Sequence, residues 1–349
     1  MTERKRLSPP EADAVFEGGG VKAVALVGAI LEAEDRGVRW QNLAGTSGGA
    51  VVAALLAAGY RGAELLAELE RLDLRSLQDR PRPLGLPLLG EAAGLLRSFG
   101  LYRGDAFLER MRALLADRGV RTFRQLRLAG AADQRYRYRV RVITADVSAR
   151  RLVVLPDGIA AYGYDPDGLE VALAVRMSMG IPFFFEPVWL RNRRTGAVHA
   201  LVDGGILSNF PVWLFDVQGV PRWPTFGFLL DEGAGVTPRF RHLLHYARAL
   251  WNTATTAHDA MAIEESLDEG AALELARHTR ARTIAIRTLG VGTTEFDLTP
   301  ERKQALLMEG RRAAAEFFDR FDFQAYVRRF RTPAADVDTP GADPYTSPL

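Results

Sequence analysis

Short apolar runs and longer segments with helical spacing alternate along the first sixty residues. The run at 13–16 ends in a glycine turn, and residues 21–37 have the apolar spacing of a helix that a glycine ends. A second apolar run at 40–44 leads into another helix, which begins near Ser47. Strand, helix, strand and helix in this order predict a parallel sheet covered by helices.

The rest of the chain continues this mixture of elements. The segment 135–148 alternates strictly and predicts a strand. One face of this strand is expected to carry Tyr136, Tyr138, Val140 and Val142. Residues 151–156 follow as the second strand of a hairpin. Further strands are expected at 199–205, 225–231 and 282–290, and further helices at 62–71, 104–118, 168–179 and 300–329.

The stretch between Arg39 and Arg61 contains no charged side chain. Its length is close to the ~20 apolar residues that span a bilayer. The cluster GTSGG at 45–49 lies in its middle, however, and such a cluster interrupts a helix. It divides the stretch into a strand and a helix that is apolar on all sides, which is typical of a buried helix. We therefore reject a transmembrane segment here.

Composition adds several limits. Apolar residues at 48% and charged residues at 25% are typical of a soluble globular protein, and a net charge of +2 argues against nucleic acid as a partner. The absence of cysteine excludes disulfides, thiolate catalysis and cysteine-ligated metal sites. The polar first residues lack the apolar core of a secretory signal, so we expect a cytoplasmic protein.

We expect a single domain over residues 13–330. Neither an internal repeat nor an obvious linker interrupts this range, and its length suits one large domain. Residues 1–12 are polar, and the segment 331–349 is rich in Pro, Asp and Thr. Both terminal segments are therefore expected to be disordered.

Three consecutive glycines stand where the first strand meets the first helix, in EGGGVKA at 17–23. Their N–H groups are uncovered by side chains and lie at a helix N-terminus, where partial positive charge favours an anion. The dinucleotide-binding spacing is met at Gly18 and Gly20 and, with a tolerated substitution, at Ala23. The P-loop spacing fails because neither Ser nor Thr follows Lys22. A phosphate cradle, an oxyanion hole and a tight turn all remain open.

The second glycine-bearing site, GTSGG at 45–49, fits the motif G-x-S-x-G. This motif places a reactive serine on a sharp turn between a strand and a helix. A serine N-cap on a glycine-rich turn is the alternative. In an α/β-hydrolase the turn follows several strands, whereas a single strand–helix–strand unit precedes Ser47 here. We therefore expect a sheet with a different strand order.

None of the five histidines stands in a glycine turn that would direct it at the serine. His199 is expected at the surface of a strand, and His278 at an exposed helix end. His242, His245 and His258 share one helical segment, and the first two lie on one face of it. Because no nearby carboxylate completes a set of ligands, we expect no metal site.

A carboxylate follows the apolar strand near residue 200, in DGGILSNFP at 203–211. An aspartate at a strand end can direct its side chain across the C-terminal edge of a sheet, where binding sites of parallel sheets gather. An Asp-Gly turn is the plain alternative. Asp203 nevertheless supplies a group that can take a proton from the serine, which the histidines do not.

The three motifs, in this order, resemble those of the patatin-like phospholipases, which use a Ser–Asp dyad. The resemblance continues in GLYRGDAFLERMRALL, ALAVRMSMGIPFFFEPV and TIAIRTLGVGTTEFDLTPERKQALLMEGRRAAAEFF, and it covers most of the chain, from 13 to 320. Each motif alone is weak, but three in order and spacing are specific. The resemblance implies a three-layer α/β/α sandwich around a mainly parallel central sheet.

The resemblance also implies roles for individual residues. Ser47 would be the nucleophile and Asp203 the general base. The oxyanion hole would be formed by the N–H groups of Gly18, Gly19 and Gly20. The supporting positions of the motifs are Lys22, Gly45, Gly49, Gly204, Gly205 and Asn209. Two positions depart from the family pattern, since Glu17 replaces a frequent aspartate and Ala23 a frequent glycine. Neither a metal nor an organic cofactor is implied.

The implied substrate is a lipid or other acyl ester with an apolar chain, and peripheral contact with a membrane is a further expectation. Segments 83–102 and 177–189 are candidates for binding the chain, the first as a mobile lid. Within the second, we assign Phe183 to Phe185 to a strand of the core. Two alternatives stay open. One is a Ser–His–Asp esterase, and the other is a nucleotide-binding or non-catalytic regulatory module.

Overall fold

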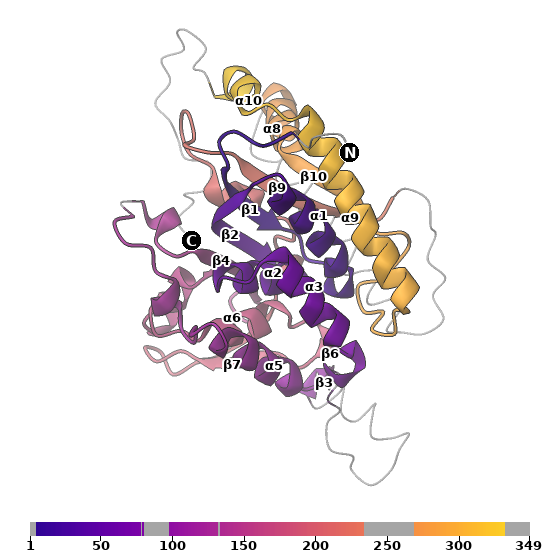
Figure 1. The fold of residues 1–349 in the computed structure, drawn as a ribbon. Coiled ribbons are helices and arrows are strands. Elements are labelled where there is room, and N and C mark those ends of the chain that lie inside the picture. Colours follow the sequence, from indigo (N-terminus) through magenta and orange to yellow (C-terminus); the bar gives the residue numbers. More distant parts are fainter. Residues whose placement is uncertain (1–4, 78, 80–97, 132, 234–268, 332–349) are drawn as a thin grey trace.

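The computed structural model describes residues 5–77, 79, 98–131, 133–233 and 269–331, which form a mixed α/β fold (Figure 1). Its strands are β1 (Glu11–Phe16), β2 (Arg39–Thr46), β3 (Gly100–Tyr102), β4 (Val140–Asp146), β5 (Arg151–Leu155), β6 (Phe183–Phe185), β7 (Val188–Arg191), β8 (Val198–Asp203), β9 (Thr225–Asp231) and β10 (Thr283–Arg287). Its helices are α1 (Ala23–Asp35), α2 (Gly48–Ala57), α3 (Gly62–Arg71), α5 (Asp105–Ala116), α6 (Val171–Ser178), α8 (Glu269–Ala281), α9 (Pro300–Arg320) and α10 (Phe323–Phe330).

The large sheet has the strand order β10-β9-β1-β2-β4-β8-β7, with β5 also paired to β4. The five strands from β10 to β4 run parallel, as the alternation of strands and helices predicts. At the other end, β5 and β8 run antiparallel to β4, and β7 runs antiparallel to β8. A separate small sheet pairs β3 with β6. The central sheet is therefore mainly parallel.

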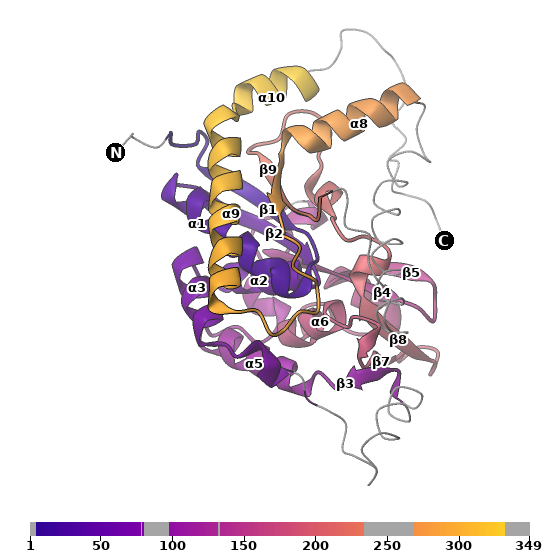
Figure 2. The ribbon, with the colours of Figure 1, turned by 90° about the vertical axis from the view of Figure 1, so that its right-hand side faces the viewer.

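One face of the sheet is covered by a layer of helices (Figures 1 and 2). Here α1 and α9 lie side by side, α9 also packs on β10, and α2 packs on β1, β2 and β4. The helix α2 is buried over nearly all of its surface, which agrees with the buried helix expected after GTSGG. No helix within the described ranges combines the length and the apolar character needed to cross a membrane.

The opposite face of the sheet carries a smaller apolar cluster. Val15, Ala44 and Ile143 project into it from three neighbouring strands, and the 3₁₀ helix η7 (Val212–Phe215) covers them. Adjacent residues on the same strands, such as Phe16, belong to the larger core on the helical face. Side chains of a strand alternate between faces, so the sheet separates the two clusters.

Strand β4 is buried along its whole length, so its alternating sequence does not mark a half-exposed strand. Arg141 is buried, and its guanidinium pairs with Asp157 at 2.8 Å, which offsets the cost of burying the charge. The prediction for Tyr136 is wrong, because this residue precedes the strand in a 3₁₀ turn and packs on the smaller cluster. The other residues predicted on its face do share the large core: Tyr138, Val140 and Val142.

The N-terminal segment also differs from expectation. Leu7 is buried, and the ammonium of Lys5 donates to the carbonyl oxygen of Phe321 at 2.9 Å. The predicted disorder over residues 1–12 is therefore wrong for residues 5–12, which apolar contact and a tertiary hydrogen bond hold in place.

Near the other end of the fold, the helical region expected at 300–329 is two helices. Asp322 separates them, and its carboxylate caps α10 by accepting from the Ala325 N–H at 2.9 Å. Apart from Arg331, the predicted tail over 331–349 lies outside the described residues, as does most of the candidate lid over 83–102.

Candidate active site

The strand order brings the three glycine-bearing motifs together. EGGG follows β1, GTSGG begins with the last two residues of β2, and these strands are neighbours with Phe16 opposite Gly45. The next strand, β4, pairs Ile143 with Thr46 on one side and Thr144 with Asp203 on the other. Ser47 and Asp203 therefore lie on opposite sides of β4. The backbones of the strands that carry them are about two strand spacings, or ~10 Å, apart, and their side chains must bridge this distance. The sequence could not show that β8 delivers Asp203 from the antiparallel direction.

Ser47 lies at the junction of β2 and α2 in a backbone conformation that side chains rarely adopt, with φ 53° and ψ −126°. Its N–H donates to the Ser178 hydroxyl at 2.9 Å, which holds the turn from α6. The turn also requires Gly49, because a methyl group there would lie 2.3 Å from the carbonyl oxygen of Phe16. A methyl group on Gly45 would likewise meet Gly49 at 2.4 Å. The predicted sharp turn at GTSGG is thus present.

Asp203 is buried, and its carboxyl interacts with the Ser47 side chain. Burial raises the pKa of Asp203 to about 7, while hydrogen bonds from the Ser47 side chain and the Gly205 N–H act in the opposite direction. The Gly205 N–H lies 2.8 Å from the carboxylate and fixes its orientation. Gly204 lets the chain pass close to β4, since a methyl group there would lie 2.5 Å from the Ile143 carbonyl oxygen. Asp203 is therefore a buried carboxyl with the basicity that proton transfer near neutral pH requires.

The glycine loop after β1 is braced by Asn209. The N–H of Gly18 donates to the Asn209 carbonyl at 3.1 Å, and the Asn209 side chain donates to the Glu17 carboxylate at 2.9 Å. Glu17 in turn accepts from the Leu230 N–H. Glutamate in place of the family's frequent aspartate thus links the loop to β9 and to Asn209.

Only part of the loop is available to an oxyanion. The expectation that Gly18 donates to it is wrong in this conformation, because its N–H is already bonded to a carbonyl. In contrast, no described residue accepts from the N–H of Gly19 or of Gly20. The N–H of Gly48, at the start of α2, also has no acceptor among the described residues. Gly48 follows Ser47 directly, and the residue after a nucleophilic serine is a common oxyanion donor. Gly20 and Gly48 pack closely, since a methyl group on Gly48 would lie 2.7 Å from the Gly20 carbonyl oxygen, so the two segments lie side by side at the turn that carries Ser47.

Two cavities lie near the proposed nucleophile. The first, of about 390 Å³, is lined by Ser47, Asp203 and the glycine loop, and by charged groups that include Lys22 and Glu232. The second, of about 120 Å³, is apolar and lies between α1, α2, α3 and α5. Met179 connects Ser47 with the second cavity, since its sulfur lies 3.6 Å from Ser47 Oγ and the residue also lines the apolar cavity. The polar cavity therefore borders the hydroxyl directly, whereas the apolar one borders its neighbour Met179.

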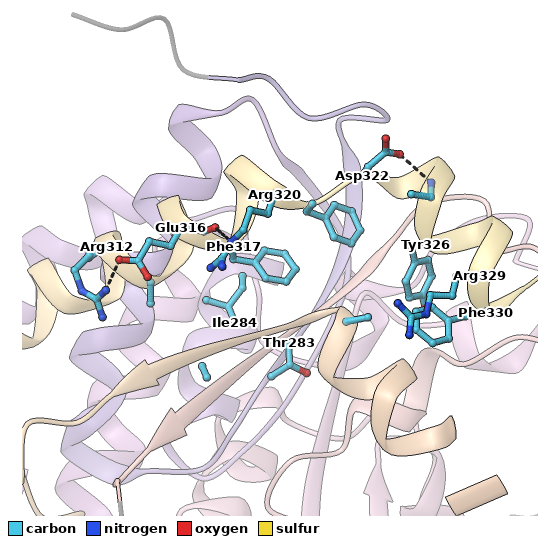
Figure 3. A pocket seen from close by; sticks show the side chains of 15 residues that line it. Thr283, Ile284, Arg312, Glu316, Phe317, Arg320, Asp322, Tyr326, Arg329 and Phe330 are labelled. Carbon is cyan, nitrogen blue, oxygen red and sulfur yellow. Dashed lines mark hydrogen bonds and ion pairs between the residues drawn. The ribbon is translucent and has the colours of Figure 1, made fainter. Parts of the chain in front are cut away.

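A larger cavity, of about 490 Å³, lies elsewhere, between β10, α9 and α10 (Figure 3). Phe317, Tyr326 and Phe330 provide aromatic walls, and Arg312 pairs with Glu316 at its rim. Neither the serine nor the aspartate of the dyad lines it. It therefore has no part in the candidate active site.

The described histidines do not reach the serine by any hydrogen bond, but their surroundings differ from expectation. His278 is buried rather than exposed, and its Nε2 is bonded to the Tyr326 hydroxyl. Burial lowers the pKa of His278 to about 3, so the ring is neutral at neutral pH. His199 is largely buried and its Nδ1 lies 2.8 Å from the buried Asp146 carboxylate. His242, His245 and His258 fall outside the described residues.

No cluster of three or more metal-binding side chains occurs in the parts of the chain that the structure describes.

Phe183 is half exposed although it belongs to β6, so the assignment of Phe183–Phe185 to the core is right only for Phe185. Sequence reasoning missed Ser178 and Met179 as neighbours of the nucleophile. Both residues belong to the segment MSMG at 177–180, whose apolar character indicates chain binding but not a contact with the serine.

Comparisons with known proteins show a family and a fold for this chain. The family model described as Patatin-like phospholipase matches residues 14–216, a range that includes all three motifs. The Bacillus subtilis (strain 168) protein YqhO is 36% identical over 314 residues, which cover 89% of this chain and 99% of YqhO. Protein R571 of Acanthamoeba polyphaga mimivirus is 24% identical over 204 residues, covering 58% of this chain and 60% of R571. VipD from Legionella pneumophila has a similar fold, with a TM-score of 0.55, 17% identity and coverage of 91% and 72% of the two chains.

Proposed function

The chain belongs to the patatin-like phospholipase family, and from this premise we propose that it is a serine lipid acyl hydrolase with a Ser47–Asp203 dyad. The observation that carries the proposal is the buried carboxyl of Asp203 against the Ser47 side chain, in a cavity that also contains the glycine loop. A serine hydroxyl becomes nucleophilic only with a base in hydrogen-bond reach, and the described histidines do not supply one.

In the proposed mechanism, the Asp203 carboxylate accepts the proton of Ser47 Oγ while Oγ attacks the carbonyl carbon of the ester. The protonated carboxyl then gives this proton to the departing alkoxide, and an acyl-enzyme on Ser47 remains. Water enters by the same route, with Asp203 again as the base, and releases the fatty acid. Neither a metal nor an organic cofactor takes part in these steps.

The oxyanion of each tetrahedral intermediate is assigned to the N–H groups of Gly19, Gly20 and Gly48. Two observations support this assignment. No described residue accepts a hydrogen bond from these N–H groups, and Gly20 and Gly48 pack closely together. The N-terminus of α2 adds partial positive charge at the same place. Loss of one such donor typically costs about 10²–10³ in rate, so these groups supply a substantial part of the catalysis.

The acyl chain is assigned to the apolar cavity and the leaving group to the polar one. An alkyl chain bound beside Met179 would move from water into contact with Val51, Leu55 and Leu69, which line the apolar cavity. Burial of apolar surface is favourable by about 25 cal/mol per Å², so this cavity selects esters with an apolar acyl group. The polar cavity, which the charged residues line, is left for the alcohol part of the substrate. Peripheral contact with a lipid surface follows as a further part of the proposal.

The test is ester hydrolysis by purified variants. Ser47→Ala and Asp203→Asn should each lower kcat/KM for p-nitrophenyl hexanoate by about 10⁴ or more, as expected when a member of a catalytic pair is lost. Ser148→Ala and Asp13→Asn are matched controls, because they change the same residue types outside the cavity. Turnover at the wild-type rate by either dyad variant, or its loss on replacement of a histidine alone, would contradict the proposal.

A further inference from the structure

The cavity beside Ser47 contains an ion pair of unequal burial. The side chain of Lys22 is only 5% exposed, and its ammonium lies 2.5 Å from the carboxylate of Glu232, whose side chain is 53% exposed. Both residues line the cavity. Lys22 comes from the turn that follows the oxyanion glycines, and Glu232 follows β9. The Lys22 ammonium is thus buried in the lining of the cavity, whereas the Glu232 carboxylate that pairs with it is exposed to solvent.

The other acidic groups of this cavity are not equivalent. Glu17 is fixed as an acceptor for the Leu230 N–H and for the Asn209 side chain, so it is committed to holding the loop. Asp231 is exposed, next to Glu232, and its carboxylate accepts from the Gly233 N–H at 2.9 Å. The cavity therefore offers one buried cation at its wall and two neighbouring carboxylates at its exposed edge.

The two members of the ion pair differ in what separation would cost. A buried ammonium that loses its counter-ion is strongly destabilised, so Lys22 requires an anionic oxygen at all times. An exposed carboxylate returns to water at little cost, since an ion pair at the surface contributes little to stability. Glu232 is therefore a partner that an anionic group of a ligand can replace.

We propose that this site selects phospholipids with a zwitterionic headgroup. The phosphate takes the place of Glu232 on the Lys22 ammonium, and the headgroup ammonium binds the released Glu232 and its neighbour Asp231. A phosphatidylglycerol headgroup brings the same phosphate but no cation, so the two carboxylates repel it. This inference rests on the proposed function and assigns a headgroup class to the same site.

The test compares substrates that differ only in their headgroup. Dihexanoyl phosphatidylcholine and dihexanoyl phosphatidylglycerol are used as dissolved monomers, so binding to a lipid surface plays no part. We expect wild-type kcat/KM to be about tenfold higher for the choline lipid. Glu232→Gln should lower this ratio by about fivefold, which is the size of one partly exposed charge interaction. Glu274→Gln is the matched control, because its carboxylate is 59% exposed on α8, outside this cavity, and it should leave the ratio unchanged.

Three kinetic outcomes overturn the inference. The first is equal hydrolysis of both lipids by the wild type, the second is preference for the glycerol lipid, and the third is an unchanged ratio in Glu232→Gln. Hydrolysis of p-nitrophenyl hexanoate in the same preparation separates these results from failure of the proposed function, which would abolish all ester cleavage. Calorimetry of the Ser47→Ala protein with glycerophosphocholine and glycerophosphoglycerol provides a readout without turnover. Tighter binding of the choline compound is expected, and equal binding would refute the headgroup assignment.

Discussion

The basicity of Asp203 predicts a specific pH dependence of activity. The base must be unprotonated to accept the Ser47 proton, and burial raises the pKa of Asp203 to about 7. As the pH falls below this value, the unprotonated fraction drops about tenfold for each pH unit. We therefore expect kcat/KM to retain ~10% of its plateau at pH 6 and ~1% at pH 5. A solvent-exposed aspartate, with a pKa near ~4, would leave the rate almost constant over this interval.

The assay for this prediction measures kcat/KM for an uncharged hexanoate ester between pH 5 and 9, with the released acid determined by chromatography. The informative control is Asp13→Asn. Burial also raises the pKa of Asp13 to about 7, yet this residue does not line the active-site cavity. If Asp203 is the base, the inflection persists in Asp13→Asn. A rate that is constant from pH 8 down to pH 5, or an inflection that disappears in Asp13→Asn, would refute the assignment.

Two further predictions follow from the same site. The raised pKa of Asp203 reflects a folded state that favours its neutral form, so the native state loses stability as the pH rises from ~4 to ~7. At pH 8 the free energy of unfolding of Asp203→Asn, measured with denaturant, should therefore exceed that of the wild type by up to ~4 kcal/mol, and the difference should vanish near pH 4. Equal stability of the two proteins at pH 8 would contradict this. Val51→Phe fills part of the apolar cavity and should lower the ratio of kcat/KM for dodecanoate over butyrate esters by about tenfold. Val147→Phe, at an exposed position, should leave this ratio unchanged. An unchanged ratio in Val51→Phe would show that the cavity does not bind the acyl chain.

Much of the fold was predictable because its signals are local. The strand at 225–231 and the helix at 62–71 match β9 and α3, since short apolar runs and helical periodicity depend on neighbouring residues alone. The register of β8 against β4 was not predictable, because antiparallel pairing depends on contacts distant in sequence. Burial of Arg141 was hidden for a similar reason, as its partner Asp157 is supplied by a later turn.

The candidate site shows the same division. The serine turn was predictable from its glycines, because only glycine permits the close approach at Gly49. The state of each N–H group was not, since the hydrogen bond from Gly18 to Asn209 joins segments nearly two hundred residues apart. The same is true of Ser178, whose hydroxyl reaches the Ser47 N–H only in the folded chain. Sequence motifs thus marked the residues of the candidate site, whereas the hydrogen-bonding partners of these residues required the structure.

The central claim is that Ser47, activated by Asp203, carries the acyl group. The most direct measurement is reaction with an alkyl fluorophosphonate, followed by intact-mass and peptide mass spectrometry. We expect a single adduct on the peptide that contains Ser47. This adduct should be absent in Ser47→Ala, form much more slowly in Asp203→Asn, and form at the wild-type rate in Asp13→Asn. Labelling of a different residue, or undiminished labelling of Asp203→Asn, would contradict it.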